Sequence, residues 1–474
     1  MAKFKHELLT ERIIDLIERG ELKAGEKLPS LRTLCRQQGI SLMTAYQAFN
    51  TLEGLGFVES RARSGYFARN PLRKSRFKKH YSKYKKLDAK SLDEMIQMVY
   101  GRELNKSVVS LSLNSPEVSL LPETKFKKSL LFVNRYRSGS SLLYGPFAGL
   151  PALKEQIAVL SVHSGMDIHS DDLIITAGSM EAINLAISAC TEAGDKILIE
   201  SPSYFGNFQT IVSLGRKPVE VETDFNTGIV IESMEKAIEE HQPKACVLVS
   251  SYSNPLGATI PNESKKKIVN LLAKHHITLI ENDIYGELYY GSQRSRSCKS
   301  YDENNNVIYC SSFSKSLAPG YRIGWIHPGK FYNKVFQAKV SHSVTSSTLT
   351  QEILAHFLKH GRYDLHLKRM RKQLHTQSLK YQQAIETYFP KDTVVSKPKG
   401  GFVLWVELNN KVDTLNLFKK AMAENISFAP GQMFSMEKDL HNYLRISIGQ
   451  PYGRKIEAAI RKLGDLIKEE ITEE

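Results

Sequence analysis

Residues 311–325 have the sequence SSFSKSLAPGYRIGW, and they decide how the larger part of the chain is interpreted. An apolar run that predicts a buried strand leads into this stretch, so Lys315 stands just beyond a strand end. The hydroxyls of Ser312 and Ser314 precede the lysine, and Arg322 follows it by seven residues. A lysine in such a position is by itself more often a surface residue, so its interpretation depends on the rest of the chain.

The chemistry of Lys315 depends on its protonation. A lysine that forms a Schiff base must lose its proton, and burial beside other cations lowers its pKa from the reference value of about 10.4. Ser312, Ser314 and Arg322 can hold a dianionic phosphate in the same corner. A lysine imine and a phosphate anchor are needed together in the chemistry of pyridoxal 5′-phosphate (PLP), which is therefore the expected cofactor.

Apolar runs alternate with helical patterns before this stretch, and that order predicts a mostly parallel sheet with helices on both faces. The predicted strands are Leu173–Thr176, Lys196–Ile199, Ala245–Ser250, Thr278–Ile280 and Val307–Ser311. Doubly wound sheets bind ligands at the carboxyl ends of their strands. The segments at these ends are Thr176–Ala182, Glu200–Tyr204, Ser253–Gly257 and Glu281–Tyr285.

These segments supply groups that suit a flat, phosphorylated ring. Thr176–Ala182 combines a strand, a glycine turn and a helix start, whose backbone N–H groups can bind phosphate. Tyr204 can stack on the ring, and Asn254 can donate to a ring hydroxyl. Together with Lys315 and Arg322 they predict one site at one edge of the sheet.

The chain continues with a second, smaller unit. A long helical pattern runs from near Gly361 towards Tyr388, and strands are expected at residues 401–407 and 443–448 around a helix. The expected fold class is therefore α/β, with a large domain of about residues 106–345 and a small α+β domain of about residues 361–474.

In this order the segments resemble the fold-type I PLP proteins of the aminotransferase class over residues ~110–470. The resemblance implies that Lys315 forms the internal aldimine and that Tyr204 stacks on the pyridine. It also implies that the phosphate is held by Ser179, the backbone of Met180, Ser312, Ser314 and Arg322.

The same resemblance assigns further contacts. Asn254 and Tyr285 would contact the ring O3′, and Tyr144 would reach the phosphate in the partner subunit. Arg445 would bind a substrate α-carboxylate, for which the alternative is a surface ion pair.

One departure from the aminotransferase pattern concerns the pyridine nitrogen. Most aminotransferases place an Asp three residues before the tyrosine that contacts the ring, and here that position is Asn282, with Asp283 beside it. The two side chains point to opposite faces of a strand, so only one can meet the ring. A carboxylate there keeps the ring protonated, and an amide does so poorly. We expect Asp283 to face the ring, because a buried carboxylate without a partner is costly, although Asn282 stays open.

Residues 1–70 predict a small helical module that ends in a hairpin. Apolar residues recur at helical spacing from Leu9 to Ile17, and Ser30 and Ser41 are placed to cap two further helices. The expected strands are Phe57–Ser60 and Tyr66–Arg69, with residues 61–65 at the tip between them. Such an order is typical of a winged helix-turn-helix.

The module resembles the GntR-type winged helix over residues ~6–70. The shared motifs are Leu28-Pro29-Ser30-x-Arg32, Ser41-x-x-Thr44 and Ser64-Gly65-Tyr66-Phe67. The resemblance implies that Arg32 contacts DNA phosphate, that Ser41, Thr44 and Tyr46 face the groove, and that Arg61, Arg63 and Gly65 act at the wing. Packing is the alternative role for Tyr46.

Positive charge is concentrated next to this module. The chain has a net charge of +15, and residues 71–90 hold nine Lys or Arg residues against one Asp. A basic stretch beside a winged helix favours a nucleic-acid partner, although a solvated linker is the alternative. We expect a DNA-binding domain at residues 1–70, a basic linker at 71–105 and a PLP-binding domain at 106–474.

Composition excludes several classes of protein. The chain has 474 residues, of which 41% are hydrophobic and 24% charged, which is typical of globular domains rather than disorder. Five scattered cysteines predict neither a disulfide scaffold nor a metal site. The absence of a secretory signal or a long apolar run predicts a cytoplasmic protein without a membrane partner.

A GntR-type winged helix, a basic linker and an aminotransferase-like domain occur together in the MocR family of bacterial transcription regulators, which this chain resembles over nearly its whole length. The resemblance implies a head-to-tail homodimer that binds double-stranded DNA. It implies a regulator that senses PLP, and an amino acid or amine through an external aldimine, with weak or absent transaminase activity. The alternatives are an active aminotransferase with an appended DNA-binding domain, and a DNA-binding protein without cofactor.

Overall fold

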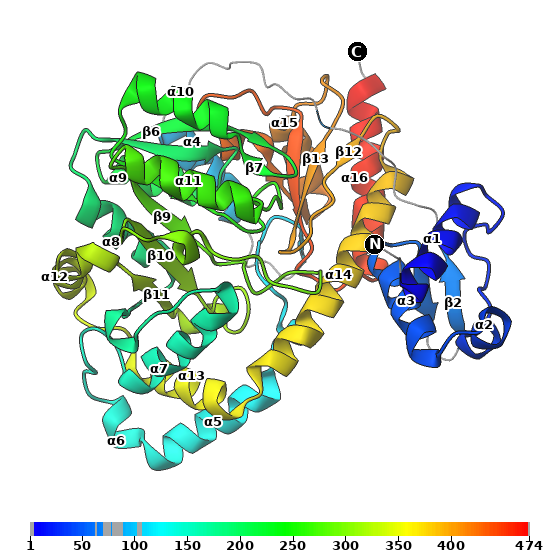
Figure 1. The fold of residues 1–474 in the computed structure, drawn as a ribbon. Helices are drawn as coiled ribbons and strands as arrows, with labels where there is room; N and C mark the ends of the chain where they lie inside the picture. The colour runs from blue at the N-terminus through cyan, green and yellow to red at the C-terminus, as the bar shows by residue number, and fades with distance from the viewer. Residues whose placement is uncertain (1–3, 62–63, 70–76, 78–88, 102–106, 473–474) are drawn as a thin grey trace. The chain divides into compact units, whose positions relative to one another are not determined.

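The structure of the protein, a computed structural model, divides into a small helical unit and a larger α/β unit (Figure 1). The described residues are 4–61, 64–69, 77, 89–101 and 107–472. The small unit comprises residues 1–76 with 379–387, and the larger unit residues 77–378 with 388–474. In the described part of the chain, the structure contains no helix that is both long and apolar enough to cross a membrane.

The small unit is the expected three-helix module with a hairpin. Its elements are α1 (Lys5–Glu18), α2 (Leu31–Gln38), α3 (Leu42–Gly54), β1 (Val58–Arg61) and β2 (Gly65–Ala68). Both predicted caps are confirmed, because the Ser30 hydroxyl accepts from the Thr33 N–H at 3.2 Å and the Ser41 hydroxyl accepts from the Thr44 N–H at 3.1 Å. Leu9, Ile13, Phe49, Leu52 and Val58 belong to the buried core that joins helices and hairpin.

The hairpin differs by one residue from the prediction. Arg61 pairs with Gly65 as the last rung of the ladder, so both residues lie in strands and not at the tip. The Ser64 N–H donates to the Arg61 carbonyl at 2.9 Å, and Gly65 adopts a φ of +98°, which favours glycine. Arg63, expected at the wing, lies outside the described residues.

The larger unit is built on an eight-stranded sheet with the order β4-β11-β10-β9-β8-β5-β6-β7. The strands are β4 (Ile174–Thr176), β5 (Lys196–Ser201), β6 (Lys217–Asp224), β7 (Gly228–Ile229), β8 (Ala245–Leu248), β9 (Thr278–Asn282), β10 (Val307–Ser312) and β11 (Gly324–His327). The five predicted strands are confirmed. Strands β10, β9, β8, β5 and β6 are parallel neighbours, whereas β11 is antiparallel to β10 and β4, and β7 to β6.

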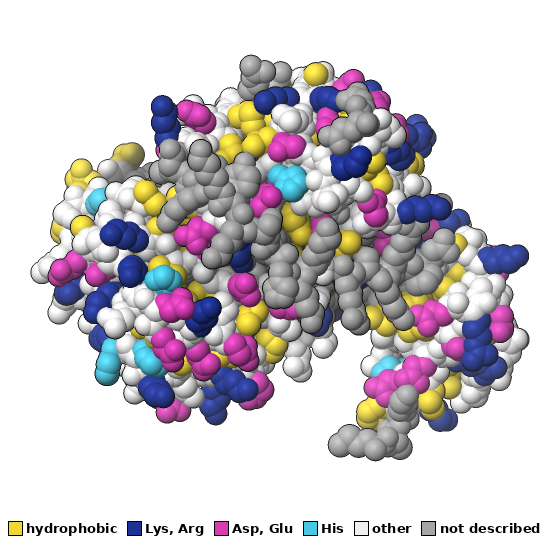
Figure 2. Space-filling model, turned by 90° about the horizontal axis from the view of Figure 1, so that it is seen from above, with side chains coloured by type: hydrophobic (Ala, Val, Ile, Leu, Met, Phe, Trp, Pro, Cys, Tyr) yellow, Lys and Arg dark blue, Asp and Glu magenta, His cyan; other side chains and the backbone are white. Residues whose placement is uncertain are grey.

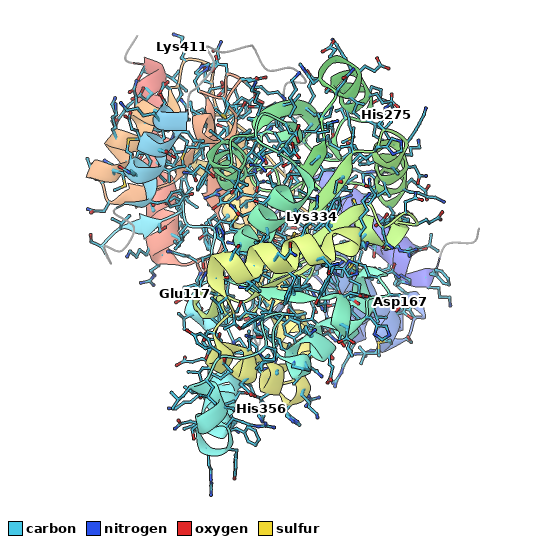
Figure 3. All side chains as sticks on the ribbon, turned by 90° about the vertical axis from the view of Figure 1, so that its left-hand side faces the viewer. Glu117, Asp167, His275, Lys334, His356 and Lys411 are labelled. Carbon is cyan, nitrogen blue, oxygen red and sulfur yellow. The ribbon has the colours of Figure 1, made fainter. Side chains whose placement is uncertain are left out.

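Helices cover this sheet and create its two described cores. The helices up to α13 are α4 (Ala89–Tyr100), α5 (Glu123–Tyr136), α6 (Ser138–Ser141), α7 (Pro151–Ser161), α8 (Ser179–Cys190), α9 (Phe205–Ser213), α10 (Ile231–His241), α11 (Asn262–Lys274), α12 (Tyr332–Ser343) and α13 (Thr348–His360). One core joins β5, β8 and β9 to α10 and α11, and the other joins β4 and β11 to α5, α7 and α13. Figure 3 shows Lys334 on α12 and His356 on α13. The His356 ring stacks on that of Phe132 of α5, and the two ring centres lie 4.1 Å apart.

The carboxyl-terminal part forms the predicted smaller sheet. Its strands are β12 (Val394–Val395), β13 (Val403–Glu407), β15 (Ala429–Pro430) and β16 (Tyr443–Ser447), in the order β12-β13-β16-β15, while β14 (Ile426–Ser427) pairs with β3 (Val109–Ser110). Its helices are α14 (Tyr363–Tyr388), α15 (Thr414–Ala423) and α16 (Arg454–Thr472). Short 3₁₀ turns complete the chain at η1 (Val118–Leu120), η2 (Val162–Ser164), η3 (Ser170–Asp172), η4 (Cys298–Tyr301), η5 (Pro319–Tyr321), η6 (Gly329–Phe331) and η7 (Gly431–Phe434).

Charge on the described surface is mixed. Figure 2 shows basic and acidic side chains interspersed over the face that it presents. This pattern agrees with the sequence, in which the strongest concentration of positive charge falls in residues 71–90. Most of those residues lie outside the described part of the chain.

Candidate ligand-binding site

A cavity of about 400 Å³ opens at the carboxyl ends of the central strands, where the sequence predicts a site. Segments far apart in the chain meet there, because the parallel strands end at the same edge of the sheet. The cavity is lined by Ile96, Tyr100, Leu113, Asn114, Ser179, Met180, Tyr204, Phe205, Val249, Asn254, Asn282, Ile284, Tyr285, Ser314, Lys315, Arg322 and Arg445.

Lys315 enters the cavity from the turn that follows β10. Its Nζ donates to the Asn114 carbonyl, which lies just after β3. Desolvation, reinforced by the positive charges of Arg445 and Arg322, lowers the pKa of the Lys315 amine to about 7. A large fraction of this amine is therefore neutral and nucleophilic near neutral pH, as Schiff-base chemistry requires.

Arg322 and the start of α8 form an anion site beside the lysine. The guanidinium donates to the Ala177 carbonyl at 3.1 Å and to the Ser314 hydroxyl at 3.3 Å. Gly178, at a φ of +91°, makes this approach possible, because a Cβ there would lie 2.5 Å from Arg322 Nη2. Ser179 is the first residue of α8, so free backbone N–H groups face the same place as the guanidinium.

The opposite part of the cavity carries aromatic and amide groups. Tyr204 lines it, and burial raises the pKa of its phenol to about 12, so the ring stays neutral. The Tyr285 hydroxyl accepts from Asn114 Nδ2 at 2.7 Å. Asn254 Oδ1 accepts from Arg445 Nη1 at 3.1 Å, which ties the sheet edge to β16.

The structure corrects the expectation that Asp283 faces the cavity. Asn282 lines it, whereas Asp283 lies on the other face of the strand end, among the residues around a separate small cavity. There the Asp283 carboxylate pairs with Arg294 and accepts from the Tyr309 hydroxyl at 2.8 Å. The expectation was wrong because it assumed that a carboxylate away from the ligand would lack a partner. Asn282 Oδ1 has no hydrogen-bond partner, although the residue is only 5% exposed.

Arg445 is a fully buried guanidinium on β16, so the alternative of a surface ion pair is wrong. Its nitrogens donate to Asn254 Oδ1, to the Tyr100 hydroxyl at 3.2 Å and to the Ser112 carbonyl. Its Nε has no partner. Each of these acceptors is neutral, so the guanidinium can still take up an anion from the cavity.

Besides Asp283, two predicted residues are not among those that line the cavity. Ser312 accepts from the Ser314 N–H at 3.2 Å and supports the turn that carries Lys315, so its contact with a phosphate stays a prediction. Tyr144 is 83% exposed, on the segment after α6, and its contact with a partner subunit stays a prediction. Lining residues that the sequence did not identify include Ile96, Tyr100, Leu113 and Asn114. The amphipathic pattern of residues 91–100 is a signal for Ile96 and Tyr100 alone.

The small unit presents a second candidate surface, on α3. Leu42, Met43 and Tyr46 are 55%, 72% and 46% exposed, so Tyr46 is not buried in the core. Arg32, on α2, is also exposed. The Arg61 side chain is held by two contacts within the hairpin. Its Nε pairs with the Glu59 carboxylate at 2.7 Å, and its guanidinium lies 4.2 Å from the Phe67 ring centre.

The residues of the cavity fit PLP. A lysine of lowered pKa, a guanidinium at a helix start, a tyrosine ring and the Asn282 amide match an aldehyde, a phosphate and an aromatic nitrogen heterocycle. The fold and this set of groups define a fold-type I PLP-dependent protein.

Comparisons with known proteins place the chain in its family. The aminotransferase class I and II family matches residues 106–463, and the gntR family of bacterial regulatory proteins matches residues 6–67. The chain therefore belongs to the aminotransferase class I and II family, and with its GntR domain it is of the MocR type, with PLP as its cofactor. The domain boundaries at residues 70, 105 and 345–361 stay predictions.

Relatives cover the whole chain or its larger part. The uncharacterized HTH-type transcriptional regulator YjiR of Escherichia coli is 34% identical over 98% of this chain and 99% of its own length, and YdcR of the same organism is 33% identical over 98% and 100%. Among solved structures, kynurenine aminotransferase of Pyrococcus horikoshii superposes with a TM-score of 0.75 at 26% identity, over 81% of this chain and 96% of that one. LysN of Thermus thermophilus, an α-aminoadipate aminotransferase, superposes with a TM-score of 0.75 at 27% sequence identity. The match covers 81% of this chain and 98% of that one.

The lowered pKa of Lys315 predicts how its reaction with PLP depends on pH. Only the neutral amine reacts, so the rate should rise about tenfold per pH unit below pH 7 and level off above pH 8. Borohydride trapping at limiting PLP, followed by mass spectrometry of the modified peptide, measures it. The exposed Lys334 is the internal control, against which the yield of the Lys315 adduct at each pH is compared. A midpoint near 10 for Lys315 would contradict the role of desolvation.

Proposed function

We propose that this chain is a PLP-dependent, DNA-binding transcription regulator that senses PLP and an amino acid or amine. The observation that carries the proposal is the union, in one chain, of a winged helix with exposed recognition-helix side chains and a cavity organised around Lys315. The relatives named as HTH-type transcriptional regulators share both parts over nearly their full length.

The residues that would hold PLP follow from the cavity. Lys315 would bind the aldehyde carbon, and Arg322, Ser314 and Ser179 would bind the phosphate. Tyr204 would stack on the ring, Asn254 and Tyr285 would contact its hydroxyl, and Asn282 would meet its nitrogen. When bound, PLP supplies an aldehyde that condenses with amines and a chromophore that absorbs visible light.

Weak transamination is part of the proposal. An amide at the pyridine nitrogen does not keep the ring protonated as a carboxylate does. Asp283 cannot substitute for it, because that carboxylate is engaged by Arg294 and Tyr309 on the other face. Asn282 therefore favours a sensor that binds amines over an enzyme that turns them over.

The second candidate function is an active aminotransferase, and the buried Arg445 favours it, because a carboxylate site is what such an enzyme needs. Mixing the PLP-loaded protein with amino acid donors and a keto acid acceptor decides between the two. Turnover of several amino acids, without binding to any DNA, would favour the enzyme.

A homodimer is also proposed, on the basis of an exposed apolar surface. The exposed apolar residues of α5 and the segment after α6 are Leu130, Leu131, Phe132, Tyr136, Leu142, Leu143, Tyr144 and Phe147. Exposed apolar side chains in this number are typical of a surface that another chain covers. Tyr144 lies in this group, as expected for a residue that reaches a partner subunit.

The DNA-binding part of the proposal predicts the effect of Arg32. Arg32→Ala should weaken binding to the upstream region of the chain's own gene, and binding to unrelated DNA by a similar factor. The slope of log affinity against log salt concentration should become smaller by about one. A gel-shift assay at several salt concentrations, with and without PLP, measures both effects. Arg19→Ala is the matched control, since Arg19 pairs with Asp15 at the end of α1 at 2.9 Å. Unchanged binding by the Arg32 variant would exclude this surface.

A further inference from the structure

The part of the cavity beyond the proposed PLP contacts is amphipathic. We call Ile96, Tyr100 and Leu113 the effector wall, because they line the cavity together with Arg445. Ile96 and Tyr100 come from the last two turns of α4, and Leu113 follows β3. Phe205 supports the wall, as its ring centre lies 5.4 Å from that of Tyr100.

Charge in this part of the cavity is unbalanced. Arg445 is 0% exposed, and its partners Asn254, Tyr100 and Ser112 are all neutral. No acidic side chain is found among the described residues that line the cavity. A buried cation without a counter-ion is costly, so this position favours an anionic ligand group beside the Arg445 guanidinium, which lines the cavity.

The same surroundings limit the rest of the ligand. In the described lining, the cations other than Arg445 are Lys315 and Arg322, both of which the proposed PLP contacts use. A second carboxylate would therefore lack a cation, and a second ammonium would lack an acid. An alkyl or aromatic group, by contrast, can pack on the effector wall.

We infer that the effector is an α-amino acid with a neutral, apolar side chain, whose carboxylate binds Arg445 and whose side chain packs on the effector wall. The inference rests on the proposed function, since it assumes PLP at Lys315. It assigns α4 a direct part in ligand recognition, and α4 lies within residues 71–105, the expected basic linker that follows the winged helix in sequence.

Affinities should follow from burial and charge. Each CH₂ group that packs on the wall should improve affinity roughly fourfold, so L-leucine should bind roughly 60-fold more tightly than L-alanine. L-glutamate and L-lysine should bind at least about 100-fold more weakly than L-leucine, because each brings an unpaired charge to the wall.

Titration of the PLP-loaded full-length protein with these four amino acids tests the inference, with the change in visible absorbance as the readout. A preference for L-leucine supports it, and equal or tighter binding of L-glutamate or L-lysine overturns it. Protein that acquires no visible absorbance with PLP overturns the proposed function instead, so the two failures are distinguishable.

A charge placed on the wall gives a second test. Ile96→Arg should lower the ratio of L-leucine to L-glutamate affinity by at least about 100-fold, because the new guanidinium pairs with the second carboxylate. Leu113→Arg tests the same wall from a residue that is 47% exposed and so tolerates the change, if the first variant misfolds. Glu94→Ala, on the exposed side of α4, is the matched control and should keep the wild-type ratio. An unchanged ratio in a folded Arg variant overturns the inference.

Discussion

Lys315→Ala is expected to leave the protein without covalently bound PLP: the visible absorbance of the lysine adduct disappears, and borohydride traps no adduct at residue 315. The reason is local, because Lys315 is the one lysine among the described residues that line the cavity. Its lowered pKa, to about 7, makes it far more nucleophilic near neutral pH than an exposed lysine. Any PLP that remains, held by Arg322 and the start of α8, should leave during gel filtration.

Two control variants test whether the loss of PLP is due to the missing Lys315 amine. One keeps the positive charge at residue 315, and the other removes a lysine elsewhere. Lys315→Arg keeps a cation but has no amine to react, so it should behave as the alanine variant does. Lys334→Ala removes an exposed lysine on α12 (Figure 3) and should keep the full absorbance. An unchanged spectrum in Lys315→Ala would refute the assignment of this lysine.

The central strands and the site at their ends could be predicted from sequence because both depend on local patterns. An apolar run such as Val307–Ser312 identifies a strand, and the polar residues after it must lie at one edge of a parallel sheet. β11 was missed, although it begins at the end of residues 311–325, the stretch that decided the fold. It has four residues, and it pairs with β4, so its place depends on residues 174–176, about 150 positions earlier.

The choice between Asn282 and Asp283 shows what local patterns cannot decide. Strand alternation correctly predicted that one side chain would face the cavity and the other would not. Which one does so depends on Arg294 and Tyr309, which hold Asp283 from the far side and come from later segments. The effector wall was missed for a similar reason, since the apolar stripe of α4 does not reveal which surface it covers.

Asn282→Asp should raise the rate of transamination roughly 10- to 150-fold. A carboxylate at this position would make a charge-assisted hydrogen bond to the protonated ring nitrogen, worth about 1.5–3 kcal/mol, and that stabilisation converts to the stated range in rate. Initial rates with an amino acid donor and a keto acid acceptor measure it, with PLP-loaded wild-type protein as the reference.

Stability provides an independent readout of the same substitution. Without PLP, the new carboxylate would be buried without a cation in contact, so the Asn282→Asp protein should unfold at a lower temperature than wild type at neutral pH. Burial raises the pKa of such a carboxyl group above its unfolded value, so this loss should shrink as the pH falls and the group is protonated. Loading with PLP should restore the stability, because the ring nitrogen then pairs with the carboxylate.

Asp283→Asn is the matched control, because it replaces a carboxylate by an amide at the neighbouring residue, the reverse of the change at residue 282. It should not raise transamination, since Asp283 does not line the cavity. It should instead destabilise the fold by about 1.5–3 kcal/mol, because Arg294, whose side chain is 6% exposed, would lose its charged contact with Asp283 and keep only its pair with Glu287 at 2.8 Å. A gain in rate from Asp283→Asn, or none from a folded Asn282→Asp protein that binds PLP, would show that Asn282 does not limit the chemistry.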